Sequence, residues 1–178
     1  MKRTIVGFTL VMMSMFSPFT YSSPVSEWKT VKQVLDEFKE TKDFVKIDFL
    51  GRRCGGLYFA LGVAVLKRGR EDLYDNFNGL MKESLSRSVI SQIIVENPNL
   101  HIRQSIKERR LLLLQSIDPI SNAYIERMEE NFIKYASLWV DDDLMKNDFK
   151  YCSEFIQTDF IPYLSKSQID KLKNSMSK

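Results

Sequence analysis

The sequence of 178 residues has few of the residues from which common catalytic sites are built. It contains one histidine, His101, and two cysteines, Cys54 and Cys152. A single histidine excludes zinc sites made of several histidines and triads that need a second one. The chain also lacks a Gly-x-Ser-x-Gly elbow, a His-Glu-x-x-His motif and the glycine-rich loops that bind nucleotides. The sequence therefore predicts no catalytic motif, no metal site and no cofactor.

The acidic run Asp141-Asp142-Asp143 does not have the spacing of a calcium loop. A loop that began at Asp141 would have Lys146 at its sixth position, where glycine is needed, and Cys152 at its twelfth, where glutamate is needed. We expect these acids to be solvated or to pair with a basic face. Two carboxylates brought together by folding would still suffice for glycoside hydrolysis. A small carboxylate-dependent hydrolase of the cell envelope is therefore the alternative function.

Excess charge is nearly absent once the N-terminus is set aside. Residues 1–22 have a basic start at Lys2 and Arg3, an apolar stretch and small residues before Ser23, which is typical of a secretory signal peptide. Without this segment the chain has 24 Lys and Arg against 23 Asp and Glu, which does not indicate a nucleic-acid partner. We predict an exported protein, periplasmic or extracellular, with a single helical domain over residues 24–178.

The even cysteine count of an exported chain favours a disulfide. A bond between Cys54 and Cys152 would close a loop of about 98 residues, which stabilises by up to about 4.7 kcal/mol in the chain-entropy model. Two free thiols are the alternative. A cysteine nucleophile is not favoured, because His101 is the only histidine that could serve as its base.

Glycine is scarce but concentrated in one apolar segment, residues 49–66. The longest uncharged run in this segment has thirteen residues, fewer than the roughly 20 that cross a bilayer. We therefore predict a buried central helix and no membrane span in the mature chain. Neighbouring helices could pack closely on a strip of small residues there, and self-association or ligand binding is the alternative use. The strip consists of Gly51, Gly55 and Gly62 in this segment and Gly69 just after it.

Apolar residues recur with helical spacing along the rest of the chain, and Pro98 and Pro119 separate the segments. Val89 to Val95 is rich in β-branched residues, but no second strand is evident, so a helix is favoured over a strand. The run 111–114 is apolar on all sides, and we expect it to be buried on several faces. The sequence predicts an all-α, single-domain bundle of about six or seven helices with one disulfide.

Arg53 is the charged residue that is hardest to explain as scaffold, because it falls on the apolar stripe of the central helix. One hypothesis gives it an internal acid, Glu154 or the 141–143 cluster, brought near by the disulfide. The other gives it an acidic group of a ligand or partner, bound in a gap over Gly56 and Ala60.

A second basic feature is the stripe of Arg103, Lys107 and Arg110. Such stripes are usually solvated, although an anionic membrane or cell-wall surface is another interpretation. The leading functional hypothesis is an exported helical binding or interaction protein without catalytic activity. Its expected partner is another envelope protein or a small anionic ligand.

Overall fold

The computed structural model describes residues 29–96, 105–138 and 142–176. The predicted signal peptide, His101, Arg103 and Asp141 lie outside these ranges. Every regular element within them is a helix, which confirms the all-α prediction, and Val89 to Val95 is helical. The elements are α1 (Val31–Thr41), α2 (Val45–Leu66), α3 (Glu71–Val95), α4 (Ile106–Ser116), α5 (Asp118–Tyr135), α6 (Asp143–Gln157), the 3-10 turn η2 (Ile161–Tyr163) and α7 (Lys166–Met176).

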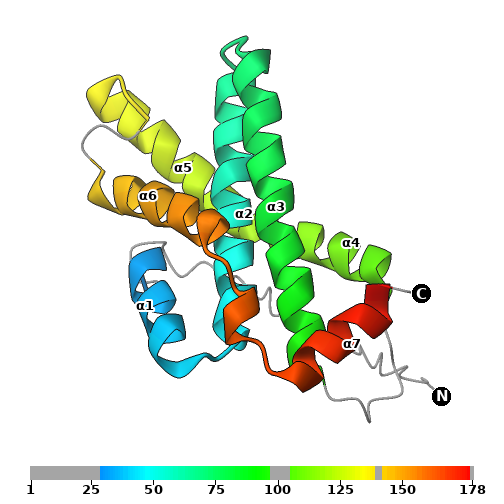
Figure 1. The fold of residues 1–178 in the computed structure, drawn as a ribbon. Coiled ribbons are helices and arrows are strands. Elements are labelled where there is room, and N and C mark those ends of the chain that lie inside the picture. The colour runs from blue at the N-terminus through cyan, green and yellow to red at the C-terminus, as the bar shows by residue number, and fades with distance from the viewer. Residues whose placement is uncertain (1–28, 97–104, 139–141, 177–178) are drawn as a thin grey trace, which may run out of the picture.

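Helix α2 is the element on which the others pack. It forms a long hairpin with α3, α5 crosses it, and α1 and α6 also contact it (Figure 1). Helices α4 and α7 lie against α3 instead. Fourteen of the 22 residues of α2 are buried, as expected for a central helix.

Among the described helices, α2 alone is long and apolar enough to qualify as a membrane span by length and composition. In this fold, however, 72% of its most apolar 18-residue window is buried by the protein itself. Core helices of bundles have the same composition, because they are covered by other helices on most sides.

The α2–α3 contact depends on small side chains. At Gly51, an added Cβ would lie 2.6 Å from the carbonyl oxygen of Ser84 and would also collide with Ser88 Oγ. Two buried serine hydroxyls of α3 donate across the interface to backbone carbonyls of the α2 region: Ser88 to Asp48 at 2.9 Å, and Ser91 to Phe44. The helices therefore approach closely where glycine faces serine.

Helix ends follow local polar signals. Thr30 and Gln33 form a capping box at the start of α1, whereas Ser26, the cap expected from the sequence, lies outside the described residues. Gly69, in the turn just after the central helix, has a φ of 71°, in the left-handed region that glycine favours. Ser165 and Gln168 form the predicted capping box before α7.

The predicted disulfide is present between Cys54 and Cys152, which joins α2 to α6 across 98 positions of the chain. Both cysteines are fully buried. Since α6 is otherwise separated from α2 by more than seventy residues of sequence, this bond fixes which face of α6 meets the central helix.

The expectation for residues 111–114 is wrong. Leu113 is buried, but Leu111 is 58% exposed, and Leu112 and Leu114 are also exposed to solvent. The reason is that α4 packs on α3 and α5 through a face whose buried residues, Arg109 and Leu113, lie one turn apart, so the other leucines of the run lie outside that face.

Candidate functional site

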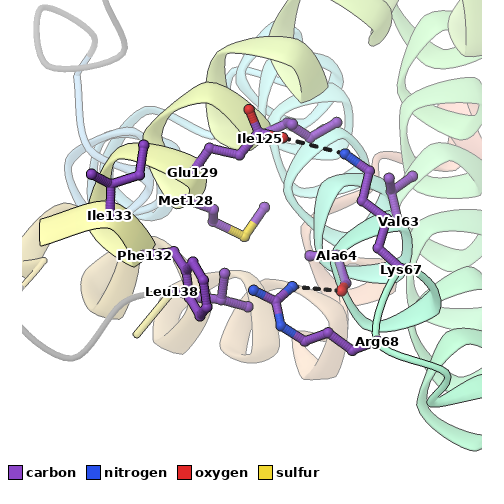
Figure 2. Close-up of a pocket in the computed structure, with 10 residues that line it drawn as sticks. All are labelled: Val63, Ala64, Lys67, Arg68, Ile125, Met128, Glu129, Phe132, Ile133 and Leu138. Atoms are coloured by element: carbon purple, nitrogen blue, oxygen red, sulfur yellow. Dashed lines mark hydrogen bonds and ion pairs between the residues drawn. The ribbon is translucent and has the colours of Figure 1, made fainter. Parts of the chain in front are cut away.

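An open groove lies between the C-terminal half of α2 and the C-terminal half of α5, with a volume of about 510 Å³ (Figure 2). It arises because the α2–α3 hairpin and α5 diverge toward their ends (Figure 1). Ten residues line it: Val63, Ala64, Lys67, Arg68, Ile125, Met128, Glu129, Phe132, Ile133 and Leu138.

The floor and walls of this groove are apolar. Met128 and Ala64 are buried at its base, and the Met128 side chain points into it (Figure 2). Phe132 is half exposed and Ile133 is 82% exposed on the α5 side. Single exposed apolar residues are ordinary on a protein surface, but apolar residues that line a concavity mark binding sites.

Two cations and one acid stand at the groove. Arg68 donates from Nη1 to the Ala64 carbonyl at 2.8 Å, and its guanidinium lies 4.9 Å from the centre of the Phe132 ring. Lys67 pairs with Glu129 across the groove at 3.2 Å, with both side chains about 60% exposed. Such an exposed pair contributes little and exchanges readily. The groove can therefore present positive charge beside an apolar surface.

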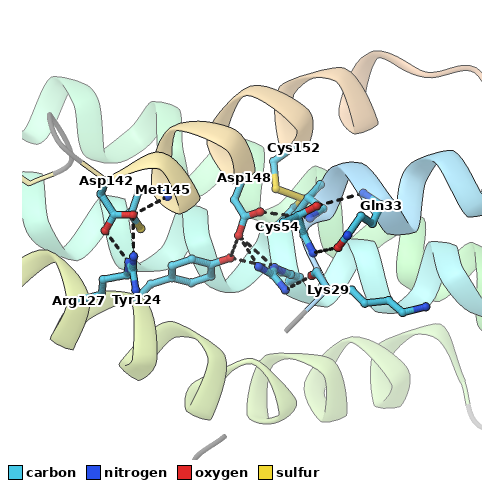
Figure 3. Close-up of polar contacts among 12 residues, drawn as sticks. Lys29, Gln33, Cys54, Tyr124, Arg127, Asp142, Met145, Asp148 and Cys152 are labelled. Atoms are coloured by element: carbon cyan, nitrogen blue, oxygen red, sulfur yellow. Dashed lines mark hydrogen bonds and ion pairs between the residues drawn. A yellow bond between two sulfur atoms is a disulfide. The ribbon is translucent and has the colours of Figure 1, made fainter. Parts of the chain in front are cut away.

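A closed ionic cluster lies deeper, where α2, α5 and α6 meet next to the disulfide (Figure 3). The Arg53 side chain is 1% exposed and Asp148 is fully buried. Asp148 Oδ2 accepts from Arg53 Nη2 at 2.5 Å and from the Tyr124 hydroxyl at 2.6 Å. Its other oxygen accepts from the backbone N–H of Val31 at 3.2 Å, and Arg53 Nη1 donates to the Lys29 carbonyl. The cluster thus ties the start of α1 to the core.

The protonation states of this cluster follow from its surroundings. Burial raises the pKa of the Tyr124 phenol well above its usual value, and the Asp148 carboxylate raises it further, so the hydroxyl keeps the proton that it donates. Burial opposes the charge of Arg53, but Tyr124 and Asp148 offset that effect and raise the pKa of the guanidinium. Arg53 therefore stays positively charged in the folded protein, and the Tyr124 hydroxyl stays neutral.

Arg53 has an internal acid, but neither of the acids suggested by the sequence. Glu154 pairs with Lys39 at 2.6 Å on the surface, and Asp142 pairs with Arg127. The partner is Asp148, which sequence reasoning missed. The sequence did contain a signal for it. Arg53 is next to Cys54, and Asp148 is one helical turn before Cys152, so a disulfide between the two cysteines would bring Arg53 and Asp148 close together.

The ligand gap expected over Gly56 and Ala60 does not exist. An added Cβ at Gly56 would lie 2.5 Å from Cγ2 of Ile120 on α5, and Ala60 is fully buried. Helix α5 fills the space because it crosses α2 at this point. The three residues proposed as a binding site therefore belong to the core.

The glycine strip is only partly a packing face. Gly51 and Gly55 meet α3 closely, at Ser84 and Leu85 respectively, and Gly62 meets Tyr74 at an ordinary 3.4 Å. Gly69 does not belong to the strip, because it lies past the end of α2 with nothing within 4 Å of an added Cβ.

Of the basic stripe, the described residues Lys107 and Arg110 are exposed on α4. Arg109, between the two, is buried and pairs with Glu96 at 2.7 Å. The side chain in this part of α4 that holds it to the end of α3 is thus Arg109, and not Lys107 or Arg110.

Asp142 is the described member of the acidic run that has a defined structural role. It caps α6 by accepting from the Met145 N–H at 3.0 Å, and it also accepts from Arg127 and Asn131. Burial alone would raise its pKa, but these donors hold the pKa of the carboxyl below its usual value. Asp142 therefore joins the ends of α5 and α6.

Metal-binding side chains are not clustered in the described ranges. No group of three or more metal-binding side chains occurs there, and the two buried carboxylates, Asp142 and Asp148, are each held by an arginine. No family model, curated protein or solved structure matches this chain. We therefore infer a function from the chain's own residues.

Proposed function

We propose that this chain is an exported helical binding protein without catalytic activity. The observation that carries the proposal is the open apolar groove between α2 and α5 (Figure 2). A protein stabilised by a buried disulfide and a buried ionic cluster can hold such a groove open, because the helices that form its walls are fixed elsewhere. Disulfides persist in oxidising compartments, which agrees with export.

The alternative, a carboxylate-dependent hydrolase, needs two acids that face a substrate. The buried acids of the described chain face arginines instead, and the groove itself contains one acid, Glu129, which pairs with Lys67. An apolar concavity with few polar groups is typical of a binding site. These features favour binding over hydrolysis.

The test uses N-phenyl-1-naphthylamine, a neutral probe whose fluorescence increases in apolar surroundings. The variant Val63→Trp fills the groove, and Val45→Trp makes the same change at the opposite, exposed end of α2. We expect the full chain to bind the probe, and Val63→Trp to weaken binding about tenfold or more, which corresponds to about 1.4 kcal/mol. Val45→Trp should bind as the wild type does.

A second groove variant protects this test against misfolding. Ile133→Lys changes a side chain that is 82% exposed, so it should leave the melting temperature unchanged while it weakens probe binding. Equal binding by wild type, Val63→Trp and Ile133→Lys would show that the groove is not a binding site and would refute the proposal.

A further inference from the structure

We infer that the groove between α2 and α5 binds a monomeric single-chain carboxylate amphiphile of the fatty-acid type, with its carboxylate at Arg68 and its chain along the apolar wall of α5. This inference rests on the proposed binding function and names the class of ligand. It depends on three observations: the volume of the groove, the chemistry of its walls and the state of its cations.

The volume and the walls suit one alkyl chain. A volume of about 510 Å³ lies in the range of roughly 300–1,000 Å³ that small-molecule sites occupy. Met128, Phe132 and Leu138 present apolar surface along it (Figure 2). A flexible thioether adapts to a chain that has no fixed shape. An interface with a folded protein would need a larger surface.

The cation at the apolar wall is Arg68. Its guanidinium extends from α2 toward Phe132 and Leu138 (Figure 2), and one of its donors is used on the Ala64 carbonyl. No carboxylate of the described residues forms an ion pair with it, whereas Arg70, two residues on, is held by both oxygens of Asp72. A planar guanidinium can bind a carboxylate with two parallel hydrogen bonds. Arg68 is thus placed to receive an acidic head group.

Lys67 adds to this charge. Its partner Glu129 sits on the opposite wall, and the exposed pair spans the groove. A ligand carboxylate can replace Glu129 at Lys67 because exposed pairs exchange readily. Charge complementarity therefore favours an anionic head over a neutral or cationic one.

The experiment measures displacement of N-phenyl-1-naphthylamine from the full chain by three ligands of equal chain length, each below its micelle concentration: laurate, dodecanol and dodecyltrimethylammonium. We expect laurate to bind about tenfold or more tightly than dodecanol, since charge-assisted hydrogen bonds are the strong ones. The cationic amphiphile should bind most weakly. Arg68→Gln should lower the preference for laurate several-fold without changing dodecanol binding, because Lys67 alone then remains to attract the carboxylate.

Two further variants separate the head-group contact from general charge. Arg70→Gln removes an arginine that lies outside the groove and should change nothing. Arg68→Lys keeps the charge but loses the planar fork, so laurate should bind between wild type and Arg68→Gln. Unchanged melting temperatures confirm that the surface variants are folded.

The outcomes distinguish this inference from the proposed function. Equal displacement by laurate and dodecanol, or a laurate preference that Arg68→Gln leaves undiminished, would overturn the inference and leave the binding function intact. Binding to vesicles of anionic lipid without displacement by monomeric laurate would also overturn it, in favour of a membrane surface. The proposed function would be refuted if the probe does not bind, or if Val63→Trp does not weaken its binding.

Discussion

At the scale of single residues, Asp148 explains how Arg53 can be buried on the apolar stripe of α2, because the two side chains form an ion pair. Removing a charge from water costs several kcal/mol, which is recovered only with good geometry and further hydrogen bonds. Tyr124 and the backbone at the start of α1 supply those bonds. The pair and its partners therefore link α1, α2, α5 and α6.

The first prediction concerns this pair. Asp148→Ala should lower the free energy of unfolding by about 3–5 kcal/mol, because Arg53 would be left charged and buried. Glu154→Ala, which removes the acid of an exposed pair, should have little effect. Both are measured by urea unfolding of the oxidised protein.

A double variant tests the interaction between Arg53 and Asp148 without leaving either charge buried and unpaired. Arg53→Met with Asp148→Leu should be less destabilised than the sum of the two single variants. Additive losses would show that the two side chains do not act as a pair.

The sequence indicated that Arg53 needs an acid, but it did not identify Asp148. The stripe of apolar neighbours on α2 was readable from periodicity, because helix faces repeat every 3.6 residues. The partner was not, since Asp148 is 95 positions away and its burial depends on the angle at which α6 crosses. The disulfide made the neighbourhood of Cys152 predictable, and the rotation of α6 decided which nearby acid turned inward.

Asp142 gives a second residue-scale prediction, on pH. Its pKa is lowered in the folded protein, so its stabilisation is fully present above its unfolded pKa of about 3.9 and is lost as the pH falls from there through the lower, folded pKa. Asp142→Asn keeps an oxygen that can cap α6 but removes the charge that faces Arg127. We expect the variant to be less stable at pH 7, and the difference to shrink as the pH is lowered below about 3.9 toward the lowered folded pKa of Asp142. A stability difference that does not shrink on acidification would contradict this role.

At the scale of helices, the α2–α3 hairpin depends on the absence of a side chain at Gly51. Gly51→Ala should destabilise the protein by about 1–3 kcal/mol, because its Cβ would press on the Ser84 carbonyl, which is backbone and cannot move aside. Gly79→Ala is the matched control: it lies within α3 with open space around it, so it should be neutral or stabilise by up to about 1 kcal/mol.

Thermal unfolding of the two variants measures this difference. Equal melting temperatures for Gly51→Ala and Gly79→Ala would show that α2 and α3 can separate slightly without loss, and that close approach is not required.

Helix positions were easier to predict than helix partners. The periods of α1, α3 and α6 are visible in the sequence, and the capping box at Ser165 and Gln168 was readable because it is local. The close approach at Gly51 has its counterpart in the serines at positions 84, 88 and 91, which share one face of α3. Serine is also common on solvent-exposed helix faces, so the sequence alone did not show that this face of α3 packs on α2. The prediction that residues 111–114 are buried was wrong for the converse reason. An apolar run shows that its residues could be buried, but it does not show how many faces of the helix other elements cover.

At the scale of the whole molecule, the groove and the core have separate causes. The core closes where α5 crosses α2 at Gly56, and the groove opens beyond that crossing, toward the far end of α2. A ligand site was expected at Gly56 and Ala60, one or two turns before the actual concavity. Small residues mark where helices approach, and the concavity forms where they diverge.

The last prediction joins export to the disulfide. Cys54 and Cys152 are fully buried in the oxidised fold, and disulfides form in exported proteins but rarely in the cytosol. Mass spectrometry of protein from its native host should therefore show an N-terminus at Ser23 or Pro24 and no thiol that can be alkylated after unfolding. A variant without residues 2–22 should stay in the cytosol and yield two alkylated cysteines, with a lower melting temperature, since the closed loop no longer constrains the unfolded chain. An intact Met1 on membrane-bound protein, or two free thiols in the exported form, would refute the predicted signal peptide or the link between export and this fold.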